Sequence, residues 1–181
     1  DVYGKDAGME FEKMWSEHIG YFVDYVNATN NNDEKGRQEA LNNLDNYRDT
    51  FSQFMATATD EKLEAKGLSD GLQMHVNQLV SAFDASVNGD YDKAYKYERE
   101  SIHHMYMVSK GLSDAITKQF PEDYHHTSAT TKAADLRSDL NYLMSEHAAL
   151  AADAMQNGYD GSENYKASVK ALEMNTKDLS K

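Results

Sequence analysis

The sequence predicts an all-α fold built from antiparallel helical hairpins. Apolar residues recur at three- and four-residue spacing along six segments, which is the period of an α-helix. The 181 residues include a single proline and are rich in Ala, Leu, Met, Glu and Lys, which favour helix. No segment alternates strictly between apolar and polar residues, as a half-buried strand would.

The first hairpin is expected over residues 6–28 and 33–57, with the polar run from Asn27 to Asp33 as its turn. The apolar seam of the first segment is Phe11, Met14, Trp15, His18, Phe22 and Tyr25. The seam of the second is Leu41, Leu44, Tyr47, Phe51, Phe54 and Ala58. Residues 57–67 are polar and are expected to form a loop.

The second hairpin is expected over residues 68–87 and 91–120. Between the two segments, Gly89 suits a left-handed backbone conformation and Asp90 suits a helix N-cap. Pro121 ends the second segment, because proline cannot continue a helix. The residues from Pro121 to Thr130 form the best candidate for an internal boundary.

The third hairpin has the cleanest seam, which is Leu136, Leu140, Leu143, His147, Leu150 and Ala154. Gly158 to Ser162 is the expected turn, with Ser162 as N-cap of the last helix. That helix takes Tyr165, Val169, Leu172 and Leu179.

Short turns between long helices make the neighbours antiparallel, so the first four helices predict an up-down four-helix bundle over residues 1–124. Residues 125–181 form the third hairpin. Because two helices alone bury little apolar surface, this hairpin must dock on the bundle, pair with another copy or continue a larger array. Self-assembly into a homo-oligomer is therefore one of the alternatives.

Composition excludes several functional classes. The net charge of −13 disfavours binding to nucleic acid and to anionic membranes. The absence of cysteine excludes disulfides and thiolate metal sites. No apolar run approaches the ~20 residues that span a bilayer, so no membrane insertion is expected. No nucleophile elbow, phosphate loop or zinc-protease motif is present, and the chain is not expected to be an enzyme.

The histidines on the seams suggest a site. His18 precedes Asn31 by 13 residues and His75 precedes Asn88 by 13, so both lie ~20 Å from their turns. His104 follows Gly89 by 15 residues and returns to nearly the same height. In an up-down bundle the three rings would meet in one layer.

A layer of imidazoles is typical of a transition-metal site for copper or zinc, and two histidines could instead bind haem iron. The candidate metal ligands are His18, His75, His104, His103 and His147, and the candidate cofactor-binding neighbours are Met14, Met74, Met105 and Trp15. Thioether sulfur adds a preference for copper(I). The sequence thus predicts a non-enzymatic protein that binds a metal ion or haem.

The alternative is a structural or interaction module in which the histidines are hydrogen-bonded core residues. His147 has no histidine opposite it on the last helix, and a hydrogen bond to Asn175 is the simpler expectation there. Glu17 and Glu146 each precede a seam histidine and point ~100° away from it, so they are expected to be solvated or bonded to the next helix.

The last hairpin resembles a helical repeat of secreted proteins from Gram-positive, spore-forming bacteria. The residues that carry the resemblance include Leu136-Arg137, Glu146-His147, Ala154-Met155, Gly158-Tyr159-Asp160-Gly161 and Asn175-Thr176-Lys177-Asp178-Leu179. These uncharacterised proteins are often labelled copper amine oxidase-like because of a separate amino-terminal domain. The resemblance implies export to the cell surface or medium. It implies no oxidase activity, because the quinone-forming Asn-Tyr-Asp/Glu motif is absent.

Overall fold

In the computed structural model, which describes residues 2–181, the chain folds into six α-helices, and no strand occurs in this part of the chain. The helices are α1 (Gly4–Asn30), α2 (Glu34–Ala58), α3 (Ala65–Val87), α4 (Tyr91–Gln119), α5 (Lys132–Asp160) and α6 (Tyr165–Leu179). The predicted all-α fold of helical hairpins is confirmed. The first four helices begin and end within a few residues of their predicted bounds, and α5 extends to Asp160, into the predicted turn from Gly158 to Ser162.

Polar caps set several of these bounds. The side chains of Asp33 and Asp90 accept hydrogen bonds from backbone N–H groups in the first turns of α2 and α4. Gly89 adopts a φ of 75°, as the predicted left-handed residue before the Asp90 cap requires. The predicted Ser162 cap is wrong, because α6 begins two residues later, after Asn164, and no side chain caps it.

The residues fall into two compact units, Asp1–Met74 and His75–Lys181, and the division lies inside α3. The loop between α4 and α5, where the sequence suggests a boundary near residue 124, lies inside the second unit. The predicted four-helix bundle of residues 1–124 extends over both units and stays a prediction.

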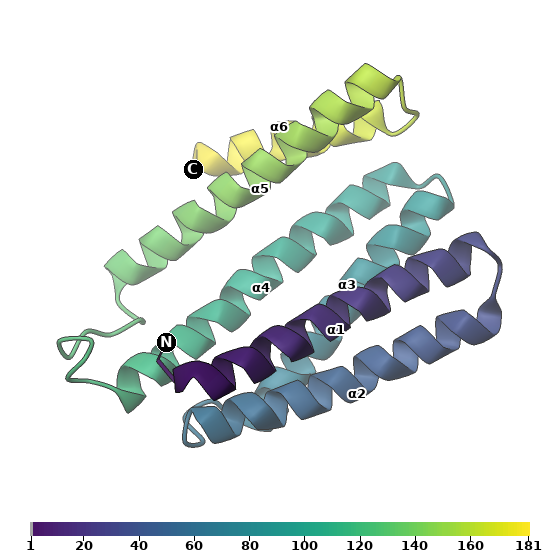
Figure 1. The fold of residues 1–181 in the computed structure, drawn as a ribbon. Coiled ribbons are helices and arrows are strands. Elements are labelled where there is room, and N and C mark those ends of the chain that lie inside the picture. Colours follow the sequence, from purple (N-terminus) through teal and green to yellow (C-terminus); the bar gives the residue numbers. More distant parts are fainter. Residues whose placement is uncertain (1) are drawn as a thin grey trace. The chain divides into compact units, whose positions relative to one another are not determined.

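In the first unit, α1 and α2 lie side by side as an antiparallel hairpin (Figure 1). Their contact is aromatic: the ring of Phe11 lies 5.6 Å from Phe51, which lies 5.2 Å from Tyr47. Tyr25 and Leu44 are fully buried between the helices. Burial of such side chains is worth ~2 kcal/mol each and holds the hairpin closed.

In the second unit, α5 and α6 form another antiparallel hairpin, and both pack on α4 (Figure 1). Its small apolar core joins all three helices through Tyr95, Leu150 and Ala171. The third hairpin therefore does not stand alone: it docks on α4 within its own unit.

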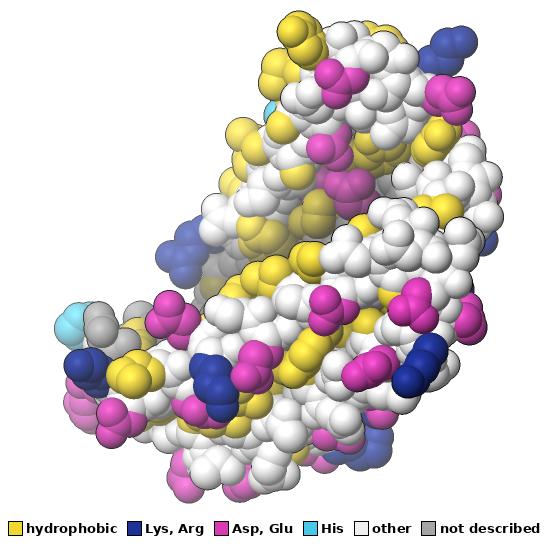
Figure 2. Space-filling view, turned by 45° about the vertical axis from the view of Figure 1, so that its right-hand side comes forward, with side chains coloured by type: hydrophobic (Ala, Val, Ile, Leu, Met, Phe, Trp, Pro, Cys, Tyr) yellow, Lys and Arg dark blue, Asp and Glu magenta, His cyan; other side chains and the backbone are white. Residues whose placement is uncertain are grey.

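The surface is acidic and mixed. Carboxylate side chains are scattered over the visible face among exposed hydrophobic ones (Figure 2). None of the helices over residues 2–181 combines the length and hydrophobicity needed to cross a bilayer.

Candidate functional site

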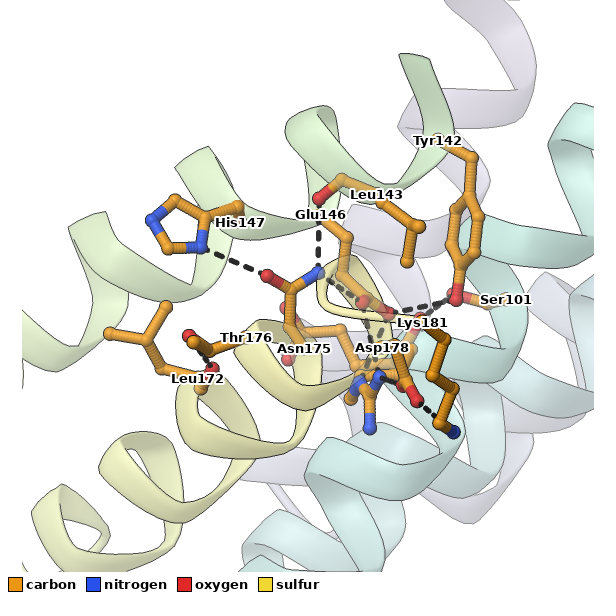
Figure 3. Close-up of polar contacts among 12 residues, drawn as sticks. Ser101, Tyr142, Leu143, Glu146, His147, Leu172, Asn175, Thr176, Asp178 and Lys181 are labelled. Atoms are coloured by element: carbon orange, nitrogen blue, oxygen red, sulfur yellow. Dashed lines mark hydrogen bonds and ion pairs between the residues drawn. The ribbon is translucent and has the colours of Figure 1, made fainter. Parts of the chain in front are cut away.

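The second unit is held together by an ion-pair network in which one arginine binds two carboxylates from two other helices. Arg99 on α4 donates from Nε and Nη2 to the two carboxylate oxygens of Glu146 on α5, at 3.0 and 3.2 Å. Its Nη2 also donates to Oδ2 of Asp178 on α6, at 2.7 Å. Figure 3 shows Glu146 of α5 and Asp178 of α6 converging between the helices. One guanidinium thus connects α4 to both helices of the third hairpin.

Glu146 is fully buried, and its carboxylate is fully satisfied. Besides the two bonds from Arg99, it accepts one from the Tyr142 hydroxyl at 3.2 Å and one from Nδ2 of Asn175 at 2.6 Å. A buried carboxylate is tolerated only when it is paired and hydrogen-bonded in this way. Removal of any one donor leaves charge or polarity buried without compensation.

Asn175 extends the network to His147. Its Nδ2 donates both to Glu146 and to the Leu143 carbonyl oxygen, at 3.0 Å, which fixes the orientation of the amide. Its Oδ1 lies 2.9 Å from Nδ1 of His147 and can only accept, so Nδ1 carries the proton. The predicted His147–Asn175 hydrogen bond is confirmed, and this histidine is a connector between α5 and α6.

The network shifts the pKa values of its members. Burial lowers the pKa of Arg99, but its hydrogen bonds with Glu146 and Asp178 outweigh that effect and raise it. Hydrogen bonds from Lys181 and Arg99 lower the pKa of Asp178. Burial and the Glu146 charge raise the pKa of Tyr142 to about 12. These pKa shifts keep Arg99 and Asp178 charged and the Tyr142 hydroxyl neutral, as their hydrogen bonds require.

Beside the network, a groove of about 540 Å³ runs between α4 and α6. It is lined by Asp92, Tyr95, Lys96, Arg99, Glu100, His103, Tyr142, Ala167, Lys170, Ala171 and Met174. Its lysines are paired with carboxylates: Lys170 lies 2.7 Å from Asp92, and Lys96 lies 3.8 Å from Glu100. The groove therefore offers donors and an apolar floor but little free charge.

His103 is the histidine at this groove. Its ring is exposed and lies 4.6 Å from the ring of Tyr142. Met174 lies on the α6 side of the same groove and is also exposed. These two side chains offer an imidazole nitrogen and a thioether sulfur at one hollow.

The other predicted ligands lie elsewhere. His18, in the first unit, stacks on Tyr47 at 4.8 Å, and its Nδ1 lies 2.5 Å from the Trp15 carbonyl oxygen. Burial lowers the pKa of His18 in spite of that hydrogen bond. His75 and His104 are partly buried residues of α3 and α4 in the second unit.

The predicted cofactor neighbours differ in exposure. Met14 is buried and Met105 is partly buried, whereas Met74 and Trp15 are exposed. Among residues 2–181, no three His, Asp or Glu side chains are grouped closely enough to hold a metal ion. The histidine layer stays a prediction.

The outer face of α5 is apolar and exposed. Its exposed large hydrophobic residues are Leu136, Leu140, Met144, Met155 and Tyr159. Leu136 and Leu140 were predicted on the buried seam with Leu150 and Ala154, but they are 62% and 48% exposed. Ala148 and Ala152, also exposed, lie between Met144 and Met155 at helical spacing. We call these seven residues the α5 outer stripe. The helix is thus apolar on the side facing away from Arg99 as well as on its buried side.

The comparisons with known proteins give no lead. No family model matches the chain, and no curated protein or solved structure matches it either.

Sequence reasoning missed the Arg99–Glu146 pair, because a charged residue on a helix is most often solvated. A partial signal was present: Glu146 follows the seam residue Leu143 by three positions, which returns it close to the same face of the helix.

Proposed function

We propose that the chain is a non-enzymatic helical interaction module, and that its contact surface is the α5 outer stripe. The observation that supports this is the two-sided character of α5. One side is fixed to α4 and α6 by the buried network, and the other presents large apolar side chains to solvent.

A continuous exposed apolar stripe is costly for a protein that acts alone. Met144 is 56% exposed, Met155 is 70% exposed and Tyr159 is 90% exposed. Single exposed hydrophobic residues need no explanation, but a row of them on one helix is typical of a surface that another protein covers. Their helical spacing fits a helix as the covering element.

The buried network supports the same function. Ion-paired groups inside a protein add little net stability, but they define one arrangement of the helices that carry them. Arg99 links both helices of the hairpin to α4, so the stripe is presented by a fixed helix. A fixed surface lowers the entropic cost of binding.

The test is the Leu140→Lys, Met144→Lys double variant, compared with the unsubstituted chain in extracts of its native source. We expect the unsubstituted chain to migrate on a native sizing column well above its 20.4 kDa mass, and the variant to migrate at that mass. Met107→Lys is the matched control, because Met107 on α4 is also 56% exposed and lies outside the stripe. Equal migration of all three chains would refute the proposal.

Haem binding is a second candidate function, and the observation that favours it is the pairing of His103 with Met174 at one groove. Haem iron takes a histidine and a methionine as axial ligands, so it needs no group of three side chains.

A further inference from the structure

We infer that the partner of the α5 outer stripe is the same stripe of a second copy, packed antiparallel with Ala148 at the two-fold axis. This inference rests on the proposed function, because it names the partner of that surface. Three properties of the stripe support it: the order of its large and small residues, the position of its charges, and its length.

One large and one small side chain lie at equal distances on either side of Ala148. Met144 lies four residues before it and Ala152 four residues after it. In an antiparallel pair, the Met144 side chain of each copy therefore packs over Ala152 of the other, and the small residue at the axis lets the two backbones approach closely. A parallel pair would place Met144 against Met144 and leave a gap at the alanines.

The charges favour the same orientation. Arg137 lies eleven residues before Ala148, and Tyr159 lies eleven residues after it, next to Asp160. Within residues 2–181, Arg137 forms no ion pair. An antiparallel pair brings Arg137 of each copy to the Tyr159 ring and the Asp160 carboxylate of the other. A parallel pair would bring the two arginines together.

The length of the stripe limits the surface that a pair can bury. From Leu136 to Tyr159 it spans ~35 Å, which is enough for six helical turns. One helix face per copy buries less than a standard protein–protein interface, and each chain carries a net charge of −13. The association is therefore expected to depend on concentration, and the sizing runs are compared at the concentrations where sedimentation shows it.

The experiment uses the absence of cysteine from the chain, which makes every introduced thiol unambiguous. The full-length variants Ala148→Cys, Met144→Cys, Ala152→Cys and Met107→Cys are oxidised under mild conditions and analysed for disulfide-linked dimers. Circular dichroism confirms the helical fold of each variant beforehand. Sedimentation of the unsubstituted chain at several concentrations measures the association itself.

We expect Ala148→Cys to link to itself. Met144→Cys should not, because its two Cα atoms would lie about 12 Å apart along the antiparallel pair, beyond the reach of a disulfide. A mixture of Met144→Cys and Ala152→Cys should give the mixed dimer, and Met107→Cys should give none.

Other outcomes overturn the inference. Self-linking of Met144→Cys, in place of the mixed dimer, would indicate a parallel pair. A chain that sediments as a monomer and forms no linked dimer, while the native complex is still lost in the Leu140→Lys, Met144→Lys variant, would mean that the stripe binds a different protein. If no linked dimer formed and the Leu140→Lys, Met144→Lys variant also left migration in the extract unchanged, the proposed function itself would be refuted.

Discussion

At the scale of single residues, the dipeptide Glu-His occurs twice, in two different environments. Glu146-His147 lies on α5, where the carboxylate is buried against α4 and α6 and the ring is hydrogen-bonded to Asn175. Glu17-His18 lies on α1 with an exposed carboxylate and a ring stacked on Tyr47. What differs is the partner that the fold brings from a distant part of the chain.

We predict that Glu146→Gln destabilises the protein by about 3 kcal/mol, because it leaves the Arg99 guanidinium buried with only Asp178 as a counter-charge. The free energy of unfolding, measured by urea titration, checks this. Glu17→Gln is the matched control and should change it by less than about 0.5 kcal/mol. The double variant Glu146→Gln, Arg99→Met should lose less than the sum of its two single variants; additive losses would contradict the pairing.

A second prediction concerns Glu98, a partly buried residue of α4. Burial, and then the charges of Asp153 and Glu146, raise its pKa to about 7 from an ordinary value of 4.5. Between pH 4.5 and pH 7, the Glu98 carboxyl therefore keeps its proton in the folded protein but loses it in the unfolded protein. The contribution to stability is full below pH 4.5 and is lost as the pH rises through 7.

Glu98→Gln should therefore gain stability relative to the unsubstituted chain as the pH rises from 4.5 to 7, by on the order of 2 kcal/mol. Urea titrations across this range measure the difference. Glu100→Gln, on an exposed position of the same helix, serves as the control for removing one carboxylate. A difference between Glu98→Gln and the unsubstituted chain that does not change with pH would contradict the raised pKa.

At the scale of helices, local sequence was sufficient. Periodic apolar residues placed six helices, and Gly89-Asp90 placed a turn and a cap. The start of α6 was harder, because Ser162 and Asn164 both suit an N-cap and nothing local chooses between them. Long-range pairs were harder still: Arg99 and Glu146 are 47 residues apart, and only the docking of the hairpin on α4 joins them.

The caps themselves can be tested at this scale. Asp33→Ala removes the side chain that accepts from the Gly36 backbone N–H at the start of α2, at 3.0 Å. The loss is expected to be about 1 kcal/mol. Glu34→Ala removes the neighbouring charge and a surface ion pair with Arg37, and should cost about 0.5 kcal/mol or less. In thermal melts, Asp33→Ala should therefore have a lower melting temperature than Glu34→Ala. Equal melting temperatures would contradict the capping role.

At the scale of the whole molecule, the two hypotheses for the histidines predict different effects of metal ions on the melting temperature. A ligand that binds only the folded chain raises its melting temperature by mass action. The predicted site of His18, His75 and His104 would thus make melting depend on zinc or copper. An interaction module whose histidines pack and form hydrogen bonds, as His18 and His147 do, should melt at the same temperature with and without these ions.

We expect the second result for protein purified without an affinity tag, since His18 stacks on Tyr47 and Nδ1 of His147 is hydrogen-bonded to Asn175. A zinc- or copper-dependent rise that disappears in the His18→Ala, His75→Ala double variant would establish the metal site instead. Hemin is tested in parallel, because it needs only one or two axial ligands. A Soret band that is lost in both His103→Ala and Met174→Ala, and kept in His126→Ala, would assign haem to the groove between α4 and α6. A band indifferent to all three substitutions would exclude that groove as the haem site.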